Sequence, residues 1–84
     1  MKILKFSASW CQPCKMLSKT LEDVDLKGCE LQELDVEENQ ELAAKYGIRN
    51  VPTMIMVDEA GEQKAVSIGM KSKADIEKWL SANA

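Results

Sequence analysis

The spacing of apolar residues changes along this chain, and each spacing predicts a different element. Ile3, Leu4 and Phe6 form a short apolar run that is typical of a buried strand. From Cys11 to about Asp23 the apolar residues recur at helical spacing, which predicts an amphipathic helix. The apolar positions of that helix are Met16, Leu17, Leu21 and Val24.

The segment that follows predicts a second strand and a second helix. Lys27-Gly28 ends the first helical pattern, and Leu31, Leu34 and Val36 then begin a second strand that runs into acidic residues. A strand–helix–strand unit of this kind has parallel strands and a right-handed crossover. Residues 39–46 then fit a shorter helix, which Gly47 ends.

The last third of the chain predicts a hairpin and a final helix. Residues 54–57 and 64–68 are expected to be antiparallel strands joined by a turn at residues 58–61. Ser72 opens the final helix. The inner side of that helix is expected to carry Ala74, Ile76, Trp79 and Leu80. The order of elements is therefore β-α-β-α-β-β-α, which is an α/β fold.

The motif that carries chemistry is Trp10-Cys11-Gln12-Pro13-Cys14, between the first strand and the first helix. Two thiols at this spacing can close a small disulfide and open it again. A sulfur in the first turn of a helix meets unpaired backbone N–H groups and the positive end of the helix dipole, which favour thiolate over thiol. Pro13 suits that turn because it lacks an N–H that would be unpaired there. The motif predicts thiol–disulfide exchange.

Length and charge narrow the possible functions. With 84 residues, the chain is expected to form one domain, residues 1–84, with a single modest core. The net charge is −3, from 11 basic and 14 acidic residues, and no basic patch predicts binding to nucleic acid or a membrane. The N-terminal apolar run is too short for a secretory signal, and no run reaches transmembrane length. We therefore expect a cytoplasmic protein, in which paired cysteines indicate redox or metal chemistry.

Further motifs follow the cysteine pair. They are Lys45-Tyr46-Gly47-Ile48-Arg49, Val51-Pro52-Thr53, Gly69 and Trp79-Leu80. Together with Trp10-Cys11-x-Pro13-Cys14-Lys15-Met16, they resemble the thioredoxin family over essentially the whole chain. The resemblance implies a minimal thioredoxin fold, a four-stranded mixed sheet with three helices that lacks the usual first strand and helix of the family.

The resemblance also implies roles for individual residues. Cys11 corresponds to the exposed nucleophile, and Cys14, one helical turn further in and more buried, resolves the mixed disulfide. Pro52 corresponds to the family's cis-proline, which turns the backbone of Val51 toward an extended substrate segment. From the local sequence alone, an ordinary trans proline is the alternative.

An apolar surface around Cys11 is a further implication of the resemblance. Its expected substrate-binding members are Trp10, Ile48, Val51, Pro52, Gly69 and Met70. Gly69 would allow the backbone of a partner to approach closely. Taken alone, Trp10 would be a partly exposed aromatic residue near a loop.

Two charged residues depart from the family pattern. The position six residues before the nucleophile, where the family usually has a buried carboxylate, is Lys5. The matching position on the neighbouring strand, where the family commonly has lysine, is Glu33. We expect a partly buried Lys5–Glu33 pair behind the cysteines, with Glu33 as a proton acceptor for Cys14. The alternative is that both side chains extend to solvent at the end of the sheet.

Cys29, the third thiol, belongs to no motif and is expected to be half-buried and structural. Regulatory oxidation and metal ligation are the alternatives. Three cysteines without a histidine make a poor zinc site, so no metal is expected. No bound cofactor is expected either, and the redox-active group is the disulfide between Cys11 and Cys14.

The implied function is that of a small monomeric dithiol reductant of protein disulfides. By the resemblance, electrons pass from NADPH through thioredoxin reductase to this chain, and then to targets such as ribonucleotide reductase. One alternative keeps the fold and takes its electrons from glutathione, as a glutaredoxin does. The other is a noncatalytic binding module that clamps a partner with the apolar surface.

Overall fold

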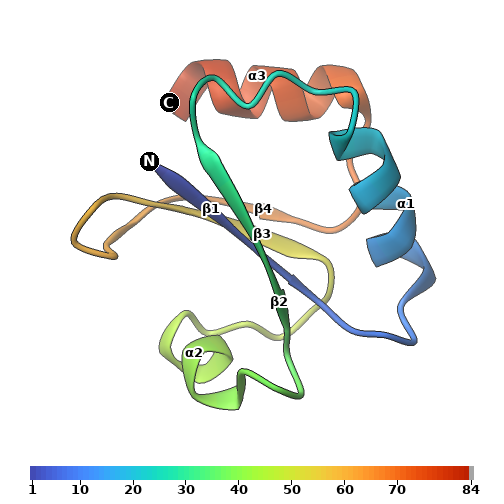
Figure 1. The fold of residues 1–84 in the computed structure, drawn as a ribbon, viewed down its shortest axis with the longest axis vertical. Helices are drawn as coiled ribbons and strands as arrows, with labels where there is room; N and C mark the ends of the chain where they lie inside the picture. The colour runs from blue at the N-terminus through green and yellow to red at the C-terminus, as the bar shows by residue number, and fades with distance from the viewer. Residues whose placement is uncertain (84) are drawn as a thin grey trace.

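A computed structural model describes residues 1–83, which form one mixed sheet with helices on both faces (Figure 1). The strands are β1 (Lys2–Ser7), β2 (Glu30–Asp35), β3 (Thr53–Val57) and β4 (Gln63–Ile68). Their order in the sheet is β2-β1-β3-β4. The β1–β2 pair is parallel and the other two pairs are antiparallel. The predicted fold class, order of elements and parallel first pair are confirmed.

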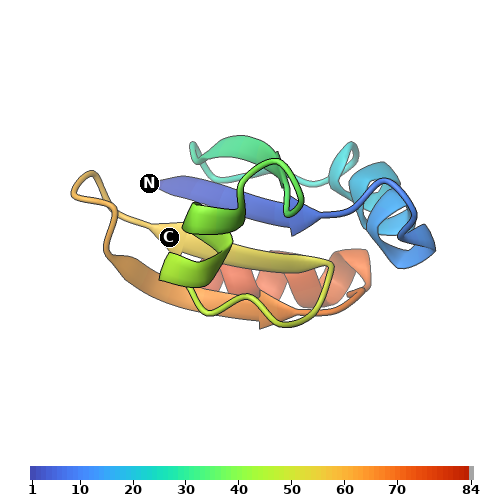
Figure 2. The ribbon, with the colours of Figure 1, turned by 90° about the horizontal axis from the view of Figure 1, so that it is seen from below.

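Three helices cover the sheet within the described residues. They are α1 (Gln12–Leu21), α2 (Gln40–Lys45) and α3 (Lys73–Asn83). Figure 2 shows α2 in front of the strands and α3 behind them, and Figure 1 shows α1 on the same side as α3. None of these helices is both long enough and apolar enough to cross a membrane.

Alternating side chains of the central strands supply two separate cores. Ile3, Met54 and Met56 pack with the buried residues of α1 and α3. Leu4, Phe6, Ile55 and Val57 lie on the opposite face, where they pack with Leu34 and Ala43. The division of β3 into two faces follows from the period of two along a strand.

Two predicted core positions are wrong. Met16 is 53% exposed, because α1 faces the sheet with Cys14, Leu17 and Leu21, and Met16 points away from that row. Ala74 is also exposed, because α3 is anchored by Ile76 and Leu80, which are four residues apart on one face. Both errors come from assigning every apolar residue of an amphipathic helix to its inner side.

Left-handed backbone conformations occur in two connections, and one of them directly follows a helix. The predicted end of the first helix at Lys27-Gly28 is too late, because α1 already ends at Leu21. Lys27 and Gly28 have φ angles of 56° and 81° in the connection between α1 and β2. Gly47, with φ of 64°, follows α2 directly. Glycine adopts this region without the steric cost that a side chain brings, so it can end a helix there.

Candidate active site

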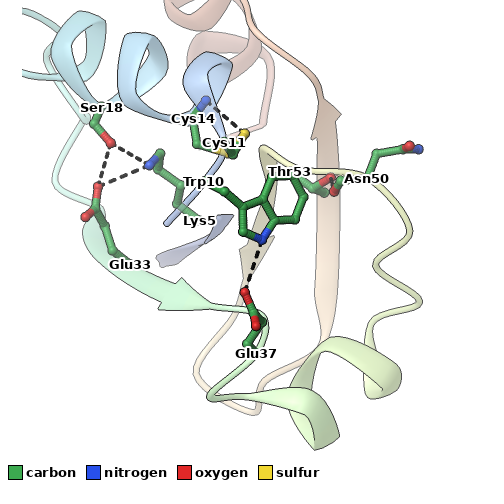
Figure 3. Close-up of a disulfide and its surroundings, with 9 residues drawn as sticks. All are labelled: Lys5, Trp10, Cys11, Cys14, Ser18, Glu33, Glu37, Asn50 and Thr53. Carbon is green, nitrogen blue, oxygen red and sulfur yellow. Dashed lines mark hydrogen bonds and ion pairs between the residues drawn. A yellow bond between two sulfur atoms is a disulfide. The ribbon is translucent and has the colours of Figure 1, made fainter. Parts of the chain in front are cut away.

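The two cysteines of the motif are joined as a disulfide at the N-terminus of α1 (Figure 3). Cys11 is the N-cap residue, and its sulfur accepts a hydrogen bond from the backbone N–H of Cys14 at 3.2 Å. Pro13 lies in the first turn, where no backbone N–H is needed. The connection from β1 is held by the N–H of Cys11, which donates to the carbonyl of Ala8 at 3.1 Å. The sequence therefore places the Cys11 sulfur among the unpaired N–H groups of a helix terminus.

The resemblance implied an exposed Cys11 and a more buried Cys14. The exposure of Cys11 is wrong for the disulfide form, although Cys14 is slightly the more buried of the two. Cys11 is 4% exposed and Cys14 is 2% exposed. Both pack with Ala8, and the half-buried side chains of Val36 and Val51 lie against this cluster. The loops after β2 and before β3 therefore cover the disulfide, which a local motif does not reveal.

The loop before β3 brings Val51 and Pro52 to the cysteines. The Val51–Pro52 peptide bond is cis, as the sequence predicted. Pro52 is buried, and its carbonyl accepts a hydrogen bond from the N–H of Gly69 at 2.8 Å. The hydroxyl of Thr53 donates to the carbonyl of Asn50 at 2.7 Å. These two bonds tie the loop to the start of β3 and to the end of β4.

Trp10, Ile68 and Met70 are large apolar side chains exposed near this loop cluster, at 71%, 55% and 37%. The indole N–H of Trp10 donates to the Glu37 carboxylate at 3.1 Å, which orients the ring beside the disulfide (Figure 3). The sequence did not identify Glu37 as a partner of Trp10. The position of Glu37 in the sequence could have indicated this contact. Glu37 follows β2 and Trp10 follows β1, and the ends of two paired parallel strands lie side by side.

Ile48 and Gly69 were also predicted to belong to the substrate-binding surface. Ile48 is half-buried and packs against the core on the α2 face, whereas Val51 packs against the cysteines. Gly69 has φ of 86°, and a Cβ at this residue would meet no atom within 4 Å. The left-handed backbone, and not a lack of space within this chain, therefore explains glycine at residue 69.

Lys5 and Glu33 form the predicted pair. They are directly opposite in the β1–β2 register, and the Lys5 Nζ lies 3.2 Å from Oε1 of Glu33. The Lys5 side chain is 1% exposed, whereas the Glu33 side chain is 55% exposed on the edge strand. The pair is thus buried at its cationic end only, and the alternative that Lys5 extends to solvent is wrong.

Ser18 of α1 completes this arrangement, which the sequence did not predict (Figure 3). Its Oγ accepts a hydrogen bond from Lys5 at 2.6 Å and donates one to Oε1 of Glu33 at 3.0 Å. The signal was its position four residues after Cys14, because residues at this spacing share one face of a helix. A buried ammonium needs such partners, since an isolated charge in an apolar interior is very costly.

A small pocket of about 220 Å³ connects this cluster with the disulfide. Cys14, Lys5, Ser18 and Glu33 all line it, together with Lys15 and Asp35. Its size is well above the roughly 10–15 Å³ that one water molecule requires. Cys14 therefore has polar neighbours where it lines this open pocket, although it is buried as a residue.

Cys29 lies away from this site. It precedes β2, is half-buried, and packs against the core beneath α1 and α3, as the sequence predicted. Within residues 1–83, no three side chains of histidine, cysteine, aspartate or glutamate are grouped as metal ligands.

Comparisons with known proteins agree with this geometry. The family model described as Thioredoxin matches residues 1–82. A thioredoxin from Rickettsia bellii (strain RML369-C) is 36% identical over 84 residues, covering 96% of this chain and 79% of that protein. A thioredoxin from Bacillus subtilis (strain 168) is 41% identical over 79 residues, covering 90% of this chain and 75% of that protein.

Solved structures are similar in fold. One is titled as thioredoxin-2, a component of the malaria parasite protein secretion machinery. It matches with a TM-score of 0.84 and 25% identity, over 98% of this chain and 82% of its own. A mutant thioredoxin from Halobacterium salinarum NRC-1 matches with a TM-score of 0.82 and 31% identity, over 98% of this chain and 73% of its own.

Proposed function

This chain belongs to the thioredoxin family and is a thiol–disulfide oxidoreductase, and on that premise we propose that Cys11 attacks protein disulfides and Cys14 resolves the product. The observation that carries the proposal is the Cys11–Cys14 disulfide at the N-terminus of α1. It is the oxidised end state of the reaction. The active form is the dithiol.

In the first step the Cys11 thiolate attacks one sulfur of the substrate disulfide. A bond forms between Cys11 and that sulfur, the substrate S–S bond breaks, and the other substrate sulfur leaves as a thiolate. The hydrogen bond that the backbone N–H of Cys14 donates to the Cys11 sulfur favours the attacking thiolate, as does the helix dipole. The chain contains no histidine, so no imidazole assists.

In the second step the Cys14 thiolate attacks the Cys11 sulfur. The Cys11–Cys14 bond forms, the bond from Cys11 to substrate breaks, and the second substrate thiolate leaves. Two electrons have then moved from the dithiol to the substrate. Pro13 stiffens the turn between the two sulfurs and so helps to hold them within reach of each other.

The substrate segment binds on the surface around the disulfide. We propose that the cis bond at Pro52 presents the backbone of Val51 to an extended segment, which pairs with it as an added strand. Apolar contacts come from the exposed side chains of Trp10 and Met70, and the backbone of Gly69 lets the segment lie close. Ile48 contributes at the margin of this surface.

The electron donor in this proposal is thioredoxin reductase, which draws on NADPH, and ribonucleotide reductase is one acceptor. Family members work without a bound cofactor, so the redox group is the cysteine pair itself. Residues 1–84 would act as a single monomeric domain in the cytoplasm. The 36% and 41% identity to bacterial thioredoxins supports this donor over glutathione.

NADPH-coupled reduction of a protein disulfide tests the proposal. Wild type and Cys11→Ser are each supplied with thioredoxin reductase, or with glutathione and glutathione reductase. We expect turnover with thioredoxin reductase only, and its loss in Cys11→Ser. Cys29→Ala is the matched control, because it removes a thiol outside the site and should retain turnover.

The other outcomes have defined meanings. Turnover with glutathione alone would replace the proposed donor, and turnover that survives Cys11→Ser would refute the nucleophile. A Cys11→Ser Cys14→Ser double variant that keeps the biological role would indicate a binding module instead.

A further inference from the structure

The edge strand β2 has a backbone that is open to pairing with a further strand. In Figure 2, β2 forms one edge of the sheet and β4 the other. Native proteins usually protect an edge strand with a bulge, a proline or charged side chains. All six residues of β2 are in unbroken register with β1, without a bulge or a proline. The protection that β2 itself provides is therefore its charge.

Alternate backbone groups of β2 point away from β1. The N–H groups of Glu30 and Val36 donate to carbonyls at the two ends of β1, at 3.2 and 2.9 Å. In a parallel pair the hydrogen-bonding residues of a strand alternate with residues whose backbone groups point to the other side. Leu31 and Glu33 therefore direct their N–H and C=O groups outward, where a further strand can use them.

The charge along this edge is negative. Residues 30–41, which form β2, the connection to α2 and its first turn, contain six of the 14 acidic residues of the chain and none of the 11 basic ones. The six are Glu30, Glu33, Asp35, Glu37, Glu38 and Glu41. Within residues 1–83, Glu33 is the one with an ion-pair partner, and Lys2 lies opposite Glu30 in the register without forming an ion pair.

These charges select the kind of strand that can pair with β2. A second copy of this chain would bring its own β2 carboxylates against them, and like charges opposite one another in a sheet are destabilising. A strand rich in lysine or arginine would instead place cations beside the carboxylates. The edge is therefore closed to a second copy and complementary to a basic segment.

The side chains of β2 alternate between two faces, and this alternation defines the pattern of the segment. Glu33 and Asp35 are on the α1 face, where both line the pocket beside Cys14. Glu30 and Gln32 are on the α2 face, where they line a separate pocket of about 450 Å³. The apolar side chains lining this second pocket include Leu4, Leu42 and Val57. A segment with basic residues on the α1 face and apolar residues on the α2 face fits both surfaces.

We propose that β2 is a docking edge for a basic, extended segment of a partner protein, which adds to the four-stranded sheet as a further strand. In this mode of recognition the main-chain hydrogen bonds supply affinity, and alternate side chains supply specificity. The docking edge is separate from the proposed substrate surface, since Gly69 and Met70 follow β4 at the opposite edge. The proposal does not rest on the proposed function, because the cysteines take no part in it.

Binding of synthetic peptides is the first measurement. The probe is a fluorescent peptide of alternating lysine and valine, and its anisotropy is followed as the protein in its disulfide form is added. We expect binding at low salt that weakens as the salt concentration rises. A peptide of alternating glutamate and valine should not bind. A lysine–valine peptide that is N-methylated at every amide keeps the charge, but it should not bind because it has no N–H to donate.

Amide hydrogen exchange, followed by NMR, shows whether the peptide adds as a strand. The outward N–H groups of Leu31 and Glu33 should exchange about tenfold or more slowly when the lysine–valine peptide saturates the protein. The N–H groups of Gln32 and Leu34 already face β1, so their exchange should change much less. This alternation distinguishes strand pairing from attraction by charge alone.

A pair of charge reversals locates the site. Glu30→Lys should weaken binding of the lysine–valine peptide by about threefold or more, because it replaces an attraction with a repulsion at the docking edge. Glu62→Lys is the matched control, since it makes the same change of charge at an exposed residue that precedes β4 on the opposite edge. This variant should bind the peptide as wild type does.

Four results would overturn the proposal. The first is equal binding of the glutamate–valine peptide or the N-methylated peptide. The second is an equal loss of affinity in Glu30→Lys and Glu62→Lys. The third is peptide-induced protection confined to Val51 and Met70, which would locate the peptide on the substrate surface. The fourth is protection of Leu31 and Glu33 that grows with protein concentration without peptide, which would identify a second copy as the occupant.

Discussion

Two lysine–carboxylate pairs in this molecule have nearly the same geometry and very different surroundings. Lys5 and Glu33 are 3.2 Å apart behind the disulfide, and Lys64 and Asp58 are 3.4 Å apart at the hairpin between β3 and β4. The exposed fractions of their side chains are 1% and 55% in the first pair, and 45% and 28% in the second.

The difference teaches that distance alone does not decide what an ion pair contributes. Asp58 is supported mainly by backbone groups, because the N–H groups of Ala60 and Glu62 donate to its Oδ1 at 2.9 and 3.0 Å. The side chain of Lys64 is exposed to water, so removing its partner should change the free energy of unfolding little. Lys5 has no access to bulk water, so it depends on Ser18 and Glu33 for its solvation.

The largest difference between the pairs is expected from truncating each lysine. Lys5→Ala should lower the free energy of unfolding by about 2–4 kcal/mol, because it leaves a cavity in the core beside Met54. Lys64→Ala should change it by no more than about 0.5 kcal/mol. Urea unfolding of the oxidised proteins measures both. Equal shifts in the two variants would remove the distinction.

Removing the acid partners is expected to give a smaller difference. Glu33→Ala should cost about 1–2 kcal/mol, because Lys5 then keeps Ser18 as its remaining partner within the described residues. Lys5→Met, which fills the same space without a charge, should be close to neutral. The comparison fails if Lys5→Met is the more destabilising of the two, by the same urea measurement.

A double-mutant cycle sharpens this contrast. In a Lys5→Met background, Glu33→Gln should lose most of its cost, giving a coupling energy of about 0.5–1 kcal/mol. The same cycle for Lys64→Met and Asp58→Asn should give about 0.3 kcal/mol or less, and less again in high salt. Additive effects at Lys5 and Glu33 would show that the pair is not coupled.

The smallest effect is expected from the pH dependence of Asp58. The hydrogen bond from the Glu62 N–H, followed by those from Lys64 and Ala60, lowers the pKa of Asp58 below its ordinary value of 3.8. The folded state therefore binds this proton less readily than the unfolded state. The resulting stability is present in full above about pH 4 and is lost as the pH falls through the lowered folded pKa.

Asp58→Asn removes that titration. Its urea midpoint, followed from about pH 6 to about pH 2, should therefore fall less steeply in acid than that of wild type. If the urea midpoints of the two proteins fell in parallel with pH, a lowered pKa of Asp58 would be contradicted. Glu33→Gln serves as the comparison, because it changes a carboxylate that is not part of the hairpin.

The fold was largely predictable from the sequence, since periods of two and 3.6 reflect local geometry. The strands around Ile3 and Ile55 and the helix around Leu17 all form where the apolar spacing predicted them. Met16 and Ala74 were placed in the core wrongly. The apolar residues of each helix extend over a wider part of its surface than the part that packs against the sheet.

The site divides in the same way. The cysteine pair, Pro13 and the cis bond at Pro52 belong to short motifs that are visible in the chain itself. Ser18 and Glu37 were not recognised as partners, because their roles require α1 and β2 to lie side by side with β1. The near-equal burial of Cys11 and Cys14 likewise depends on loops far away in the sequence.

The sequence by itself determined the elements, their order and the chemistry of the paired thiols, because each follows from neighbours along the chain. The resemblance also indicated a Lys5–Glu33 pair behind the thiols, but only the tertiary structure decided that Lys5 is enclosed, that Glu33 meets solvent, and that Ser18 links them. The physical reason is that solvation of a charge is a property of its whole three-dimensional environment, whereas spacing encodes only the direction in which a side chain leaves its own element.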